Sequence, residues 1–194
     1  NIGEFCVRGS RFVGASGHVH AFEASRTTFA DLTRNLTLNG LTNVTANQMA
    51  LTSTSGPVEF FLSRGIASGS SSLRPAHDFS GSTVRVSGIT LDDYCGGAGI
   101  SRVDFIKMDI EGAELDAFKG ATGLLSSPDA PVLVFEYHGV VASRFGVEKD
   151  AVPQLLATFG YQITRLGSSA GSPQRGGDNV PENSLAVPPR RQTP

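Results

Sequence analysis

Hydrophobic and polar positions along the chain predict strands and helices in alternation. Ser25 is a typical N-cap residue. Phe29, Leu32 and Leu36 follow it at helical spacing, as far as an Asn-Gly pair that is typical of a helix end. Further helices are predicted at residues 114–125 and 152–159. Short β-like runs predict strands at residues 18–23, 44–49, 58–62, 84–89, 103–108, 132–137, 161–166 and 184–187.

The order of these predicted elements indicates the fold class. Alternating strands and helices favour an α/β fold with a mostly parallel sheet and helices on both faces, which the strand at residues 184–187 closes. The sequence contains no internal repeat and no clear domain boundary, and its 194 residues suit one core. We therefore predict one domain over residues 1–187 and a disordered tail over residues 188–194.

The charge, the apolar runs and the cysteine content of the sequence limit which partners and which compartment we expect. Lys and Arg number 16 against 18 Asp and Glu, a formal net charge of -2 that gives no case for nucleic acid or an anionic membrane as partner. No apolar run approaches the ~20 residues that span a bilayer, and the start of the sequence has no signal-peptide pattern. Cys6 and Cys95 make no disulfide framework, so we expect a cytoplasmic protein.

Charged residues crowd the end of the predicted strand at residues 103–108. Ligands of open α/β sheets bind beyond the carboxyl ends of the strands, where Lys107, Asp109 and Glu111 are expected. Two carboxylates this close repel unless a cationic ligand, a metal or Lys107 compensates. The alternative is a surface ion pair of these acids with Lys107 or Lys119.

Glu23 ends another predicted strand, just before a helix. In nucleotide-binding α/β folds, a carboxylate at this position accepts hydrogen bonds from ribose hydroxyls. The alternative is a solvated acid that caps the helix. The Asn-Ile-Gly start of the sequence is compatible with the tail of a glycine-rich turn, where the backbone can approach a ligand closely.

Several segments resemble one family. Ile-Lys-Met-Asp-Ile-Glu-Gly-Ala-Glu at residues 106–114, followed by Phe-Lys-Gly-Ala at residues 118–121, is similar to the signature of FkbM-type methyltransferases. These are class I enzymes that depend on S-adenosylmethionine. Further segments resemble the family in the right order, at residues 17–23, 35–40, 68–73, 134–138 and 183–188. The resemblance implies a Rossmann-like class I methyltransferase sheet with an antiparallel closing strand.

The resemblance also implies roles for individual residues. Asn1 and Gly3 would end the glycine-rich motif that holds the cofactor, and Glu23 would hold its ribose hydroxyls. The other residues expected near the cofactor are Ala24 and Ser25 beside the ribose, Met49, Ala50 and Leu51 beside the adenine, and Asp109 at the transferring methyl group. The residues expected on the acceptor side are Lys107, Glu111, Glu136 and His138.

Two departures from the family pattern stand out. Ala24 occupies a position where the family usually has proline, which affects local rigidity more than chemistry. The first strand and the opening half of the glycine-rich motif are missing. We therefore expect an N-terminally incomplete domain, in which two strands have unpaired edges and the cofactor site is only partly formed.

Transfer to an alcohol requires a base that takes the hydroxyl proton. His138 has the best unperturbed pKa for this role, although a loop histidine is an equal interpretation. Glu136 would share a strand face with it. Asp109 or Glu111 could serve instead, either as base or as ligands of a divalent metal, for which the sequence gives no support of its own.

Three hypotheses for the function follow. The first is S-adenosylmethionine-dependent O-methylation of a hydroxyl on a small metabolite or sugar. The second is an NAD-dependent Rossmann oxidoreductase, because Glu23 suits the ribose of NAD equally well. The third is a noncatalytic remnant that acts as a binding module.

Overall fold

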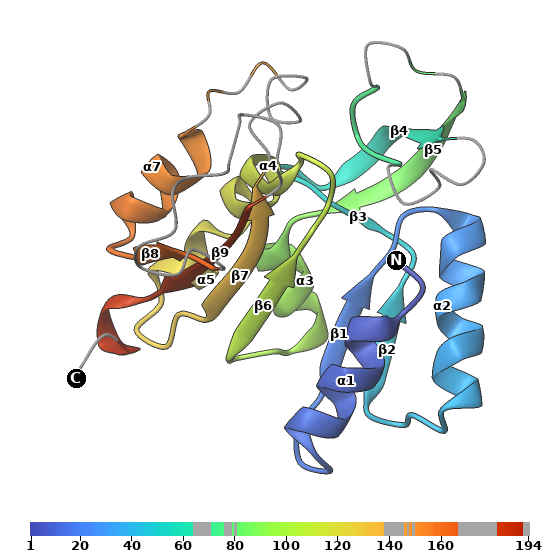
Figure 1. Cartoon of the computed structure of the whole chain (residues 1–194), viewed down its shortest axis with the longest axis horizontal. Helices are drawn as coiled ribbons and strands as arrows, with labels where there is room; N and C mark the ends of the chain where they lie inside the picture. The colour runs from blue at the N-terminus through green and yellow to red at the C-terminus, as the bar shows by residue number, and fades with distance from the viewer. Residues whose placement is uncertain are drawn as a thin grey trace. The chain divides into compact units, whose positions relative to one another are not determined.

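The computed structural model describes residues 1–63, 71–75, 79, 81–137, 146, 148, 150–166 and 182–191 (Figure 1). The chain forms two compact units. Unit 1 comprises Asn1–Ala50, Gly56–Leu73 and Ser80–Gly88. Unit 2 comprises Leu51–Ser55, Arg74–Phe79 and Ile89–Pro194. Among the helices within these described residues, none combines the length and the apolar character that crossing a membrane requires.

Unit 1 begins with a two-stranded parallel sheet and two helices. Its elements are α1 (Glu4–Val13), β1 (Val19–Phe22), α2 (Arg26–Leu38) and β2 (Val44–Asn47). The prediction for α2 is confirmed: Ser25 Oγ accepts the backbone N–H of Thr28 at 3.4 Å, and Leu32 and Leu36 are buried. The strand predicted at residues 44–49 ends at Asn47, so Met49 lies beyond it.

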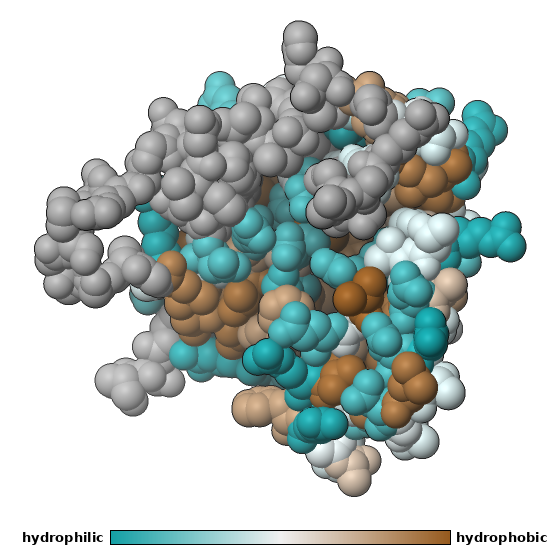
Figure 2. All heavy atoms as spheres, turned by 45° about the vertical axis from the view of Figure 1, so that its right-hand side comes forward, coloured by the Kyte–Doolittle hydropathy of each residue, from teal (hydrophilic) through white to brown (hydrophobic). Residues whose placement is uncertain are grey.

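The helix α1 lies where the sequence predicts no element. Only Ser10 is buried on it, whereas Phe5 and Phe12 are exposed by 61% and 93%. The apolar and polar residues of α1 do separate at helical spacing, but Gly9 in its middle disfavours a helix. On the face presented in Figure 2, hydrophobic side chains lie in several separate groups among hydrophilic ones.

A second ladder in unit 1 is antiparallel. β4 (Gly56–Ser63) pairs with β5 (Gly81–Ile89), and β3 (Ala50–Leu51) completes the strand order β3-β5-β4. Phe60 from β4 packs with Ala24 and Ala50 in a small core. This core therefore joins the residues that follow β1 to the residues that follow β2.

Unit 2 is built on a four-stranded sheet in the order β6-β7-β9-β8. The strands are β6 (Phe105–Met108), β7 (Val132–Tyr137), β8 (Gln162–Arg165) and β9 (Glu182–Val187). The helices are α3 (Leu91–Ala98), α4 (Glu114–Lys119), α5 (Thr122–Ser126) and α7 (Ala151–Thr158). Phe118 and Phe135 are fully buried, with ring centroids 5.6 Å apart and an interplanar angle of 81°.

The direction of the strands differs in part from the prediction. β1–β2 and β6–β7 are parallel, whereas β4–β5, β7–β9 and β8–β9 are antiparallel. The expectation of a mostly parallel sheet is therefore wrong for the described pairs, although an antiparallel closing strand, β9, is confirmed. Both parallel pairs have helices between their strands in the sequence, which is the connection that parallel pairing requires.

Two local predictions also need correction. The helix predicted at residues 114–125 is divided into α4 and α5, with Gly120 between them. In the predicted tail, Pro189–Arg191 form a 3₁₀ helix (η2). Arg191 donates to the carbonyl and to the carboxylate of Asp104, each at 3.3 Å, and these bonds hold the segment against the chain before β6.

Candidate functional site

In unit 1, several predicted cofactor residues gather at the carboxyl end of β1. Glu23 follows this strand, and its backbone N–H donates to the carbonyl of Asn47 at 3.0 Å. Its Oε1 accepts the backbone N–H of Ser25 at 2.9 Å, while Oε2 pairs with the amino group of Asn1. The Glu23 side chain is only 12% exposed. These bonds fix a carboxylate at the edge where both parallel strands end.

Residues with small side chains lie near Glu23. Ala24 and Ala50 are buried in one core. Gly3 is buried with a φ of 101°, and a Cβ there would lie 2.8 Å from Leu32 Cδ1. The positive φ therefore favours glycine at this position. Met49 is half-buried after β2.

In unit 2, the predicted catalytic residues gather at the end of β6. Lys107 Nζ donates to Asp109 Oδ2 at 2.6 Å, with side chains exposed by 22% and 37%. Lys107 and Met108 pair in register with Val134 and Phe135, so Glu136 comes next on β7. Because alternate residues share a strand face, Glu136 lies on the same face as Lys107.

The turn after β6 has an unusual backbone. Glu111 is the one non-glycine residue with positive φ in the described part of the chain, at 57°, and Gly112 follows with a φ of 97°. Glu114 stabilises this turn, because its Oε1 accepts the backbone N–H of Ile110 at 3.0 Å and of Gly112 at 3.4 Å. Burial raises the pKa of Glu114, against the opposing effect of these hydrogen bonds, and the nearby charge of Asp109 raises it further.

The structure thus brings the predicted residues together in two groups. Asn1, Glu23 and Ser25 are joined by hydrogen bonds in unit 1. Lys107 and Asp109 form an ion pair in unit 2, which also contains Leu51, Glu111 and Glu136. His138 lies outside the described residues. Within the part of the chain that the structure covers, no three potential metal ligands of the His, Cys, Asp or Glu type form a group.

Comparison of the sequence with known protein families identifies the family of this domain. Residues 1–163 match the model of the methyltransferase FkbM domain. The chain belongs to the FkbM methyltransferase family. Glu23 at the carboxyl end of β1 and Asp109 at that of β6 both lie within the residues that match this model.

A solved structure supports the fold of the FkbM domain. The crystal structure of methyltransferase FkbM from Methylobacillus flagellatus KT is similar with a TM-score of 0.54 and 20% sequence identity, over 95% of this chain. This chain spans 40% of the length of that protein. Among curated proteins, no sequence matches it significantly.

Sequence reasoning missed the role of Glu114 in this FkbM domain. The residue belongs to the motif but was expected to be part of an ordinary helix start. Its side chain is buried, with 2% of the residue exposed, and it binds the backbone of the preceding turn. Sequence reasoning had no signal for this burial, because Glu is rarely buried and neighbouring residues of a helix do not share a face.

Proposed function

We propose that this FkbM domain is an S-adenosylmethionine-dependent methyltransferase acting on a hydroxyl oxygen of a small metabolite or sugar. The observation that carries the proposal is the family match over residues 1–163. The carboxylates of Glu23 and Asp109 at strand ends support it, because ligands of open α/β sheets bind at such ends.

The geometry around Glu23 fits the ribose of the cofactor. The carboxylate is held by the N–H of Ser25 just after the carboxyl end of β1. A ribose hydroxyl can donate a hydrogen bond to such a carboxylate. We propose that Gly3, Ala24, Met49, Ala50 and Leu51 surround the rest of the cofactor, since small or apolar side chains allow close approach.

The proposed reaction needs positioning and a base. When bound, S-adenosylmethionine supplies an electrophilic methyl group, whose carbon–sulfur bond breaks as the carbon–oxygen bond forms. The hydroxyl proton must pass to a base, and His138, Asp109 and Glu111 are the candidates. Lys107 orients Asp109 through their ion pair, and Glu111 belongs to the turn that follows. General-base catalysis contributes typically ~10²–10⁴-fold to the rate.

We also propose that the β6-β7-β9-β8 sheet belongs to a Rossmann-like class I methyltransferase fold. The antiparallel β9 between β7 and β8 supports this, because the family resemblance implies such a closing strand. The parallel β6–β7 pair with intervening helices is also typical of Rossmann-like sheets.

Calorimetry with two ligands tests the function. S-adenosylhomocysteine should bind the protein, whereas NAD should not. Glu23→Gln should weaken S-adenosylhomocysteine binding roughly tenfold or more, because a charged acceptor is replaced by a neutral amide. Glu59→Gln, an exposed position on β4, is the matched control and should bind normally. Binding of NAD alone, or equal affinity in both variants, would contradict the proposal.

A further inference from the structure

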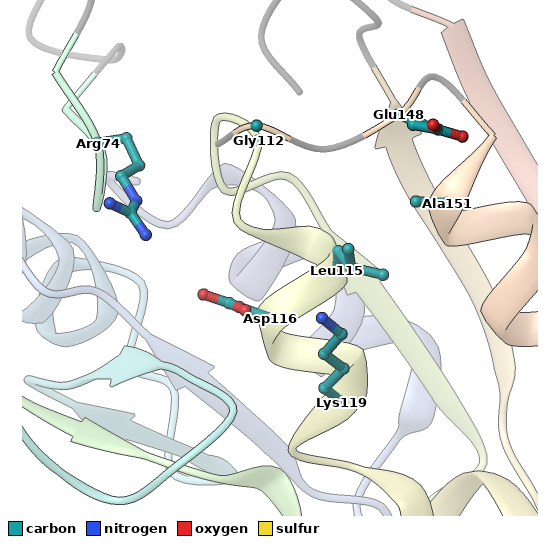
Figure 3. A pocket seen from close by; sticks show the side chains of 8 residues that line it. Arg74, Gly112, Leu115, Asp116, Lys119, Glu148 and Ala151 are labelled. Atoms are coloured by element: carbon teal, nitrogen blue, oxygen red, sulfur yellow. The ribbon is translucent and has the colours of Figure 1, made fainter. Parts of the chain in front are cut away.

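Unit 2 contains a cavity of about 420 Å³ beside α4 (Figure 3). Gly112, which follows β6, lies on one side of it, and Glu148, which follows β7, on another. α4 contributes Leu115, Asp116 and Lys119. The volume lies within the range of about 300–1,000 Å³ that is usual for small-molecule sites.

The place of this cavity in the fold points to a ligand. Gly112 in its lining comes after the carboxyl end of β6, and open α/β sheets bind their ligands beyond such strand ends. Gly112 also belongs to the turn that Glu114 stabilises next to Asp109. The cavity therefore shares a backbone segment with the proposed catalytic residues.

The cavity is lined by charges of both signs. Arg74 and Lys119 are cationic, and Asp116 and Glu148 are anionic. Figure 3 shows the side chains of Arg74 and Asp116 pointing into the same space. Asp116 is half-buried, and neither Asp116 nor Lys119 takes part in the ion pairs formed among the described residues. Both are thus available to a ligand.

This mixture of charges disfavours ligands that carry charge of one sign only, and it suits hydroxyl groups. A carboxylate only accepts hydrogen bonds, and an ammonium or guanidinium group only donates them. A hydroxyl does both, so neighbouring hydroxyls of one ligand can match Asp116 and Lys119 together. An anionic ligand would be repelled by Asp116 and Glu148, and a cationic one by Arg74 and Lys119.

We propose that this cavity binds the methyl acceptor and that the acceptor is an uncharged, polyhydroxylated molecule of the saccharide class. Asp116 accepts hydrogen bonds from its hydroxyls, while Lys119 and Arg74 donate to their oxygens. Leu115, which is 9% exposed, and Ala151 supply apolar contacts. The assignment of the ligand as the acceptor rests on the proposed function.

Ligand-observed NMR with matched sugars tests the proposal on the whole protein. The probes are the methyl glycosides of glucose, galactose and rhamnose, with methyl glucuronide and methyl glucosaminide as charged analogues. At least one neutral glycoside should bind, roughly tenfold more tightly than either charged analogue. Asp116→Asn and Lys119→Met should each weaken neutral binding about tenfold, since hydrogen bonds to charged groups are lost.

The charge of Asp116 should affect neutral and anionic sugars in opposite directions. Asp116→Asn removes a negative charge, so glucuronide binding should strengthen while neutral binding weakens; a merely structural defect would weaken both. Asp129→Asn, an exposed position in the loop before β7, is the control and should change neither. Neutral binding that is unaffected by Asp116→Asn and Lys119→Met, or tighter glucuronide than neutral binding in the unmodified protein, would overturn the proposal.

Separate calorimetry distinguishes this proposal from the proposed function. If S-adenosylhomocysteine binds but none of the neutral glycosides does, the saccharide proposal is wrong and the methyltransferase function stands. If glycosides bind with the expected dependence on Asp116 while S-adenosylhomocysteine does not bind, the proposed function fails, whereas the saccharide site in the cavity is supported.

Discussion

Glu114 combines two properties that conflict at the scale of a single residue. Its carboxylate satisfies the backbone N–H groups of Ile110 and Gly112, yet burial disfavours its ionised form and raises its pKa. An acceptor at this position is therefore needed by the turn, but a negative charge is not. Substitutions that separate acceptor from charge resolve which property matters for stability.

We predict that Glu114→Ala lowers the free energy of unfolding by about 1–3 kcal/mol, because it leaves two partly buried N–H groups without an acceptor. Glu114→Gln keeps an acceptor oxygen and should cost less. Urea denaturation followed by circular dichroism measures both. Equal losses in the two variants would contradict a role for the acceptor.

The raised pKa gives this comparison a pH dependence. The folded state holds the Glu114 proton more tightly than the unfolded state, whose pKa is near 4.5. Its stabilising contribution is therefore complete below pH 4.5 and is lost as the pH rises through the raised pKa. Relative to Glu114→Gln, the unmodified protein should lose stability as the pH rises above 4.5. If the free energy of unfolding of the unmodified protein instead rose with pH relative to that of Glu114→Gln, the prediction would be wrong.

At the scale of elements, prediction succeeded where local signals and packing agree. α2 has a capping serine and an apolar stripe that is buried, and both were visible in the sequence. α3 was missed because Gly96 and Gly97 disfavour a helix. It forms because Thr90 caps it, accepting the N–H of Asp93 at 2.9 Å, and because Asp92 accepts two N–H groups from α5.

The division between α4 and α5 also depends on a contact that sequence patterns do not encode. A Cβ on Gly120 would lie 2.2 Å from the carbonyl oxygen of Thr52 and 3.1 Å from Thr90 Cβ. Close approach of these backbones requires glycine, which helical spacing alone does not reveal. The predicted continuous helix was therefore wrong at one residue.

A glycine-to-alanine substitution should have opposite effects between α4 and α5 and within α3. Gly120→Ala should lower the free energy of unfolding by about 3 kcal/mol, the upper end for overpacking, because backbone must move. Gly97→Ala should raise it by about 0.5–1 kcal/mol, since a Cβ there meets nothing within 4 Å and alanine favours the helix. Thermal denaturation measures both, and a stabilised Gly120→Ala variant would refute the packing argument.

At the scale of the whole molecule, the sequence predicted which residues follow each strand better than it predicted which distant segments come together. Glu23 and Asp109 were placed correctly at strand ends, because each follows its own strand directly in the sequence. The cavity beside α4 was not predicted, since Arg74 and Lys119 are distant in the sequence and meet only through the fold. Strand direction was likewise predictable only for the helix-connected pairs.

The two units differ in how well their strands are protected. β7 is paired on both sides and its Leu133 and Phe135 are fully buried, whereas β1 is half-buried throughout and belongs to a two-stranded sheet. Two-stranded sheets are only marginally stable alone. Amide hydrogen exchange should therefore be slower in β7 than in β1.

Binding of the cofactor product should slow amide hydrogen exchange more in β1 than in β7. If Glu23 holds the cofactor ribose, binding of S-adenosylhomocysteine closes local openings of the carboxyl end of β1. At a ligand concentration one hundred times the Kd, the stabilisation is about 2.7 kcal/mol, or roughly 100-fold slower exchange. Hydrogen-exchange mass spectrometry should show this slowing at residues 19–25. Since β7 already opens only through larger unfolding events, its exchange should change less. Slowing confined to β7 would mean that the cofactor does not bind at Glu23.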